Sequence, residues 1–229
     1  MPEPVEGALT HRVVQPRQAC ADAPPTLLLL HGRGSDEVDL LGLASELDPR
    51  LFVVSARAPF ELGFGYHWYE LVEVGRPEPR TFAEGFRRLD QFTRDLAELY
   101  GTDPQQLYLL GFSQGAMMAG TLTLRAPERV AGTIMLSGYL PLSAGMEYDE
   151  SGLAGRPFFV AHGAQDPVIP VEFGREAAEY LRKVDADLEY REYSMAHQVE
   201  YDELRDVSQW LTGRLDSPTS GRQTGGRTG

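Results

Sequence analysis

The stretch that decides the fold of this 229-residue chain is LYLLGFSQGAMMA, residues 107–119. A short apolar run, a Gly-x-Ser-x-Gly turn centred on Ser113 and a helical run follow one another, which is the strand–turn–helix order of a nucleophile elbow. Glycine suits positions 111 and 115, because side chains there would collide with the neighbouring strand and helix in so tight a turn. The small residues Ala116, Ala119 and Gly120 let the helix lie close to the sheet. Its N-terminus places a partial positive charge beside Ser113.

Apolar runs typical of buried strands lie on both sides of this unit, and amphipathic helical patterns separate them. The predicted strands are residues 9–15, 26–30, 51–55, 107–110, 133–137, 158–161 and 188–193, and the predicted helices are residues 36–47, 81–100, 114–125, 171–184 and 198–212. The helix after residue 80 is predicted to begin at Thr81, with Glu84 completing a capping box and Gly101 as its stop signal. Alternating strands and helices predict a mainly parallel sheet in a three-layer α/β sandwich.

Composition narrows the classes of partner. The chain has 21 Lys+Arg against 34 Asp+Glu, a net charge of -13, which disfavours nucleic acid and anionic membrane surfaces. No secretory signal or run long enough to span a bilayer is recognisable, so a cytoplasmic protein without stable membrane association is expected. A single cysteine, Cys20, leaves no disulfide framework and no cysteine cluster for a metal. Residues 1–216 are predicted to form one domain, and residues 217–229 a disordered tail.

A serine hydroxyl becomes a good nucleophile only when a base removes its proton, so a histidine partner is required. Elbows of this kind carry their groups in the chain order Ser, acid, His. His162 and His197 follow Ser113, and Asp166 lies between them at the end of a predicted strand. Chain order therefore selects Asp166 as the acid that orients the imidazole and His197 as the base. The other acids of this region, Asp149, Asp185 and Asp187, are interpreted as solvated charges.

An oxyanion hole needs two backbone N–H donors. The residue after the nucleophile, Gln114, supplies one. The second is predicted to be the N–H of Arg33, in the glycine-containing turn LHGRG at residues 30–34. His31, in the same turn, is interpreted as structural because it precedes the serine and the base is already assigned.

Two long loops, residues 57–80 and 138–156, each follow a strand and should emerge near the carboxyl edge of the sheet, where ligands bind in such folds. The first loop is rich in aromatic residues. These residues form either part of the substrate pocket or a small core beneath the loop, and the sequence leaves both interpretations open. The predicted pocket consists of Phe64, Trp68, Tyr139 and Leu140.

Five motifs in order resemble the phospholipase/carboxylesterase family, which includes acyl-protein thioesterases and many bacterial carboxylesterases. They are LHGRG at 30–34, GFSQGA at 111–116, LSGYLP at 136–141, HGAQDPV at 162–168 and the late His197. The resemblance covers residues 26–212. It implies an α/β-hydrolase fold with little or no lid, hydrolysis of carboxylic esters or thioesters without cofactor or metal, a position of Trp68 near the site, and a homodimer in many members.

Two residues depart from the family pattern. Ala196 precedes the histidine where glycine is common, which is a mild change. Arg33 stands where acyl-protein thioesterases usually have an apolar residue near the acyl channel. A guanidinium at that point suits a short-chain, aryl or carboxylate-bearing ester better than a long acyl chain.

The sequence therefore predicts a serine carboxylesterase that hydrolyses small carboxylic esters through an acyl-enzyme on Ser113. One alternative is an acyl-thioesterase or lysophospholipase of the same family. The other is a non-catalytic ligand receptor on the same scaffold, which the intact set of three residues argues against. A dienelactone-type hydrolase usually carries a cysteine at the position of Ser113, and peptidase relatives usually carry an additional domain.

Overall fold

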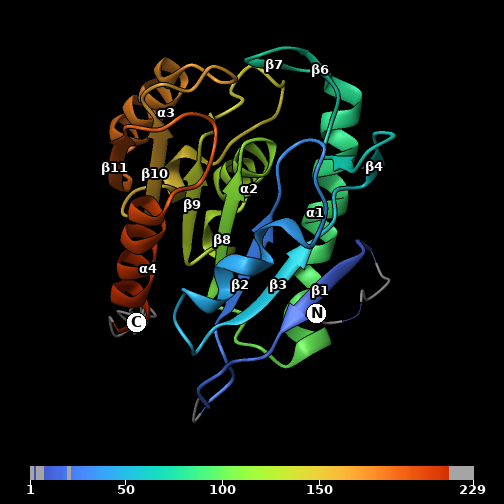
Figure 1. The fold of residues 1–229 in the computed structure, drawn as a ribbon, viewed down its shortest axis with the longest axis vertical. Coiled ribbons are helices and arrows are strands. Elements are labelled where there is room, and N and C mark those ends of the chain that lie inside the picture. The colour runs from blue at the N-terminus through green and yellow to red at the C-terminus, as the bar shows by residue number, and fades with distance from the viewer. Residues whose placement is uncertain (1–2, 4–7, 20–21, 217–229) are drawn as a thin grey trace, which may run out of the picture.

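The core of the protein is a seven-stranded sheet, seen in a computed structural model that describes residue 3, residues 8–19 and residues 22–216 (Figure 1). Cys20 and the predicted tail at 217–229 lie outside the described residues. The strands are β1 His11–Val14, β2 Thr26–Leu30, β3 Phe52–Ala56, β8 Leu107–Phe112, β9 Gly132–Leu136, β10 Pro157–Gly163 and β11 Asp187–Tyr193. Their order is β1-β3-β2-β8-β9-β10-β11, with β1 antiparallel to β3 and the other pairs parallel. The predicted, mainly parallel sheet is confirmed.

Helices cover both faces of this sheet. One face packs against α1 Pro79–Tyr100, α2 Gln114–Arg125 and α3 Val171–Lys183, and the other against η1 Asp39–Ser45 and α4 Tyr201–Asp216. Strand β2 shows why both faces are apolar: Leu28 and Leu30 pack with α1 and α2, whereas Leu27 and Leu29 pack with η1 and α4. The three-layer sandwich is therefore confirmed. Among the described residues, no helix has the length and apolar character required to cross a membrane.

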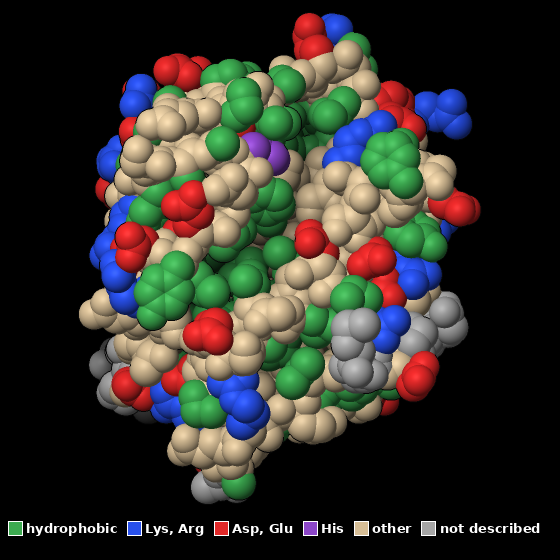
Figure 2. Space-filling view, in the orientation of Figure 1, with side chains coloured by type: hydrophobic (Ala, Val, Ile, Leu, Met, Phe, Trp, Pro, Cys, Tyr) green, Lys and Arg blue, Asp and Glu red, His purple; other side chains and the backbone are tan. Residues whose placement is uncertain are grey.

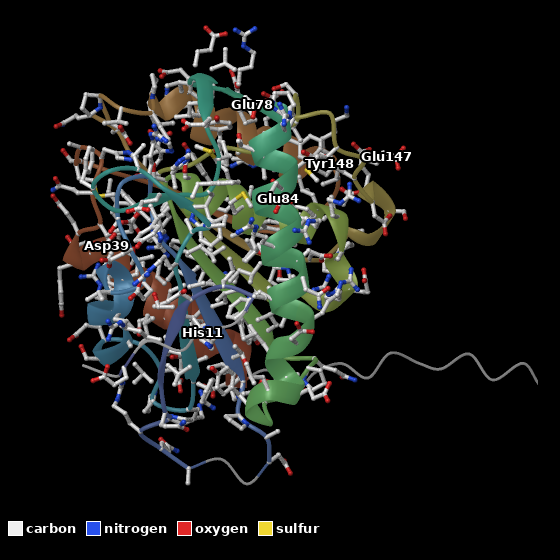
Figure 3. The ribbon with its side chains drawn as sticks, turned by 90° about the vertical axis from the view of Figure 1, so that its right-hand side faces the viewer. His11, Asp39, Glu78, Glu84, Glu147 and Tyr148 are labelled. Carbon is white, nitrogen blue, oxygen red and sulfur yellow. The ribbon has the colours of Figure 1, made fainter. Side chains whose placement is uncertain are left out.

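The start of α1 differs from the prediction. The helix begins at Pro79, and its N-cap is Glu78, whose carboxylate accepts hydrogen bonds from the N–H groups of Arg80 at 3.0 Å and Thr81 at 2.8 Å. Glu84 does not close a capping box; its side chain bonds to two arginines of the next turn. A proline in the first turn with an acidic cap before it is as good a helix start as the predicted one. Figure 3 shows Glu78 at the upper end of α1 and Glu84 further along it.

Two other helices have boundaries that differ from the prediction by more than one residue. The helix expected at 36–47 is the short 3-10 helix η1, before which the Asp36 carboxylate accepts a hydrogen bond from the Val38 N–H at 2.8 Å. This local bond offers the backbone an alternative to α-helix, and Gly42 weakens the helix further. The helix expected at 198–212 is α4, which begins at Tyr201 and ends at Asp216.

The aromatic loop at 57–80 contains two hairpins. They are formed by β4 Phe60–Glu61 with β5 Tyr66–His67, and by β6 Leu71–Glu73 with β7 Arg76–Pro77. The first hairpin is bonded to the turn after β2, because the Gly34 N–H donates to the Tyr66 carbonyl at 2.8 Å and the Tyr66 N–H donates to the Ser35 carbonyl at 2.7 Å. The second long loop contains the short helix η3 Glu150–Gly152, and the short helix η2 Pro127–Arg129 follows α2.

Candidate active site

Ser113 lies between β8 and α2 in a strained backbone conformation, with φ +54° and ψ -120°. Its N–H donates to the Leu136 carbonyl at 2.9 Å, which anchors the turn to β9. A Cβ atom on Gly115 would lie 1.9 Å from the Leu30 oxygen, and one on Gly111 would lie 2.2 Å from the Gly115 oxygen. The close approach predicted for these two glycines is therefore confirmed. A strained residue held by such packing is typical of functional sites.

A hydrogen-bonded chain connects Ser113, His197 and Asp166, which lie far apart in the sequence. The distance from Ser113 Oγ to His197 Nε2 is 3.0 Å, and the distance from His197 Nδ1 to Asp166 Oδ2 is 2.6 Å. His197 is the most accessible of the three residues: its side chain is 14% exposed, whereas Ser113 is buried and the Asp166 side chain has no exposed surface. His197 is the one histidine of the described residues that is not buried. Figure 2 shows histidine atoms at the surface beside a hollow lined with hydrophobic side chains.

The loop after β10 fixes the Asp166 carboxylate. Its Oδ1 accepts hydrogen bonds from the Val168 N–H at 2.8 Å and the Ile169 N–H at 2.9 Å, so Oδ2 is left for His197. The buried ring of His162 braces the same loop by donating from Nε2 to the Ile169 carbonyl at 2.8 Å. Burial lowers the pKa of His162, which keeps this ring neutral beside the hydrogen bond between Asp166 and His197. This bracing role was not predicted from the sequence.

The two predicted oxyanion donors are available. Neither the Gln114 N–H nor the Arg33 N–H donates to another group of the described residues. Gly32, which precedes Arg33, lies directly against the elbow: a Cβ atom on it would be 3.4 Å from Ser113 Cβ. A free N–H at the first residue of a helix and another on the facing turn form the usual pattern of an oxyanion hole.

His31 has a structural environment, as predicted. Its Nδ1 donates to the Gly32 carbonyl at 2.7 Å, and its Nε2 accepts from the Ala58 N–H at 3.0 Å. Both ring nitrogens are therefore occupied, and burial lowers the pKa of the ring. A neutral His31 ties the turn after β2 to the start of the aromatic loop.

The side chain of Gln114 has a role that the sequence did not reveal. It is 2% exposed, and its Oε1 accepts from the Trp68 N–H at 3.0 Å while its Nε2 donates to the Tyr69 carbonyl at 2.9 Å. One residue therefore offers a backbone N–H to the site and fastens the aromatic loop with its side chain. The glutamine of the GFSQG motif was the available signal, but its partners are about 45 residues away in the chain.

The predicted pocket residues lie in different environments. The structure differs from the predicted pocket position of Trp68. This residue has no exposed surface, and its Nε1 donates to the His31 carbonyl at 2.9 Å. Trp68 therefore belongs to the core beneath the loop and has no surface for a substrate. Phe64 is 76% exposed and its ring covers Gly34. Tyr139 and Leu140 are buried and line a hollow with Gly75, in the turn between β6 and β7, and with residues of α3.

No group of histidine, cysteine, aspartate or glutamate side chains within the described residues is arranged to hold a metal ion. The arrangement that remains is a serine with a histidine and a buried carboxylate, placed at the carboxyl edge of a parallel sheet. This fold and this site define the α/β-hydrolase class. Comparison with known proteins gives the family within it.

A model of the phospholipase/carboxylesterase family matches residues 10–214, so the chain belongs to this family. Acyl-protein thioesterase 1 of Kluyveromyces lactis is 29% identical over 160 residues, which cover 65% of this chain and 68% of the relative. Acyl-protein thioesterase 1 of Emericella nidulans is 26% identical over 223 residues, covering 86% and 92%. The crystal structure of a Bacillus cereus carboxylesterase superposes with a TM-score of 0.81 at 24% identity, covering 90% of this chain and 94% of the other, and this likeness supports the fold. Family membership supports esterase or thioesterase activity in general.

Proposed function

We propose that the protein is a serine carboxylesterase that hydrolyses small carboxylic esters through an acyl-enzyme on Ser113. The observation that carries this proposal is the hydrogen-bonded chain from Ser113 Oγ through His197 to Asp166, with its 3.0 Å and 2.6 Å contacts. The 3.0 Å contact is within the range at which a nucleophile and its base transfer a proton, and the 2.6 Å contact lets the Asp166 carboxylate orient that base.

In the proposed reaction, Ser113 Oγ attacks the ester carbonyl carbon while His197 Nε2 takes the hydroxyl proton. Asp166 keeps the His197 proton on Nδ1 and stabilises the imidazolium that forms. The backbone N–H groups of Arg33 and Gln114 bind the negatively charged oxygen of the tetrahedral intermediate. The imidazolium then gives its proton to the leaving alcohol, the C–O bond breaks, and water hydrolyses the acyl-enzyme by the same steps.

The proposal is tested with a fluorophosphonate probe and with p-nitrophenyl esters, using the wild type and Ser113→Ala. We expect the probe to label the wild type alone, and turnover to fall about a thousandfold or more in the variant. Ser137 serves as a matched control, because it is also buried and also has a positive φ at the end of a strand, but its hydroxyl has no hydrogen-bond partner among the described residues. Ser137→Ala should still be labelled. Unchanged turnover in Ser113→Ala would refute the proposal.

Two alternatives predict different results in the same experiments. A thioesterase or lysophospholipase would prefer acyl-thioesters or lysophospholipids in a series of acyl chain lengths run beside the p-nitrophenyl esters. A ligand receptor would give one slow burst of p-nitrophenol and no steady-state turnover. The complete hydrogen-bonded chain favours a catalyst over a receptor.

A further inference from the structure

The side chain of Arg33 lies at the rim of the candidate site. The preceding residue, Gly32, packs against Ser113, so the Arg33 side chain starts one residue away from the nucleophile. Its side chain is one-third exposed, and its ionic partner is Glu70, with 3.4 Å between a guanidinium nitrogen and a carboxylate oxygen. Gln114 fastens the segment just before Glu70 to the elbow. Arg33 and Glu70 therefore meet beside the proposed oxyanion hole.

The donors of Arg33 are unused within the described residues. Its contact with Glu70 lacks hydrogen-bond geometry, and its guanidinium donates to no other described group. Arg57 provides the contrast. Its guanidinium makes two short bonds to the buried Glu37 carboxylate, at 2.6 and 2.8 Å, and has a structural role. A guanidinium presents up to five N–H groups in a planar fork that matches a carboxylate.

Glu70 orients Arg33 without saturating it. The backbone of Glu70 is anchored through its N–H to the Thr81 hydroxyl at 3.0 Å, and its second carboxylate oxygen lies 3.5 Å from His67 Nε2. The Glu70 side chain is half exposed, so its attraction for Arg33 is screened by water. A carboxylate that arrives with the substrate can therefore compete for the fork, because it would form the bidentate bonds that Glu70 does not.

The acidic character of the protein makes the Arg33 guanidinium a selective position for an anionic substrate. The chain carries a net charge of -13, so an anionic substrate meets an unfavourable field over much of the surface. The Arg33 guanidinium, whose donors are free and whose backbone follows the Gly32 that packs against Ser113, is a local exception. Phe64 covers the adjacent Gly34 and offers an apolar contact to a short carbon chain.

We propose that the Arg33 guanidinium binds a carboxylate carried by the substrate, so that the preferred substrates are short carboxylic esters bearing a second, ionised carboxyl group. This inference rests on the proposed esterase function. It names one class among the short-chain, aryl and carboxylate-bearing esters that the sequence left open.

The test compares kcat/KM for matched pairs of esters that differ in one charge. Mono-p-nitrophenyl glutarate and its carboxamide analogue place the charge on the acyl side, with the uncatalysed rate subtracted. The ester 4-acetoxybenzoate and 4-acetoxybenzamide place it on the leaving group. In each pair, the ratio of charged to neutral substrate reports the role of Arg33, whereas turnover of either ester reports the esterase function.

We expect a ratio above one for at least one pair in the wild type. Arg33→Gln should lower that ratio about tenfold, mainly through KM, because a charge-assisted hydrogen bond to the substrate is lost. Glu70→Gln should raise the ratio by removing the competing carboxylate, which provides a second test if Arg33→Gln folds poorly. Arg76→Gln is the charge-matched control, since Arg76 pairs with Glu73 on an exposed hairpin, and it should leave the ratio within about twofold.

The role of Arg33 would be overturned if the wild type, Arg33→Gln and Glu70→Gln gave equal ratios in both pairs. Arg33 and Glu70 would then form an ion pair at the rim without a role in substrate binding. A wild-type ratio below one in both pairs would also overturn this role. Failure of the wild type to hydrolyse any of the four esters would instead refute the proposed function, and the inference with it.

Discussion

Glu203 is a carboxylic acid with no exposed surface, in the first turn of α4 and six residues after His197. Neither of its carboxyl oxygens makes a well-formed hydrogen bond within the described residues. Burial raises the pKa of Glu203 to about 8. The backbone N–H of Glu200 opposes this rise in part, and the Glu200 carboxylate adds to it. The folded protein therefore holds a proton on Glu203 at neutral pH, whereas an unfolded chain releases it near pH 4.5.

This difference makes stability depend on pH in a defined direction. A group whose pKa is higher in the folded state contributes fully below its unfolded pKa, near 4.5, and loses that contribution as the pH rises through 8. The slope is about 1.4 kcal/mol per pH unit, so the limiting loss by pH 9 is about 5 kcal/mol. Opening of the first turn of α4 would hydrate the carboxylate and so limit this loss. We therefore expect the free energy of unfolding to fall by about 3–5 kcal/mol.

The assay is urea unfolding of the wild type and Glu203→Gln at several pH values between 5 and 9. Glutamine preserves the shape of a protonated glutamate but cannot ionise, so the curve of the variant should lack this slope and cross that of the wild type as the pH rises. Asp202→Asn is the matched control, because Asp202 lies on the same turn with an exposed side chain paired to Arg205. Its curve should follow the wild type within about 0.5 kcal/mol. Parallel curves for the wild type and Glu203→Gln across this pH range would refute the reasoning.

Two further predictions concern the elbow at Ser113 and the clamp, which is the Gln114 side chain with its bonds to the Trp68 N–H and the Tyr69 carbonyl. Gly115→Ala should destabilise the protein by more than about 3 kcal/mol in thermal unfolding, because the added Cβ would overlap the Leu30 oxygen. Gly213→Ala is the control, because a Cβ there meets nothing within 4 Å. It should be neutral or stabilising by up to about 1 kcal/mol. Gln114→Ala should cost about 2–4 kcal/mol in urea unfolding, because it leaves the Trp68 N–H and the Tyr69 carbonyl unpaired in the interior. A loss below 0.5 kcal/mol would contradict the clamp.

Features determined by local chemistry could be predicted from the sequence. The helix predicted at 114–125 has the same bounds in the structure, because the glycines around Ser113 and the small residues after it allow few other conformations. The chain order of serine, acid and histidine selected three side chains that the structure places in contact. The start of α1 was misplaced by two residues because Glu78 and Thr81 are both acceptable caps, and composition does not say which one the backbone uses.

Features determined by distant partners could not be predicted. An aromatic residue in a long loop faces either the ligand or the interior, and for Trp68 the choice depends on the His31 carbonyl, which β2 places beneath the loop. The clamp from Gln114 depends on the same loop. Glu203 lies on a helix whose pattern allows it to be solvated, and its burial depends on how α4 packs on the sheet. In each case the decisive neighbour is far away in sequence.

The contacts around Ser113 form two units that are bonded separately. On one side, His31 and Tyr66 tie the turn that carries Arg33 to the aromatic loop, and Gln114 ties that loop to the elbow. On the other side, the loop after β10 and the His197 loop are held together by backbone bonds such as that from the Gln165 N–H to the Met195 carbonyl, at 3.1 Å. Under the proposed function, the first unit binds the oxyanion and selects the substrate, and the second moves the proton. The Arg33 side chain can therefore change with substrate class while the proton-transfer groups remain in place.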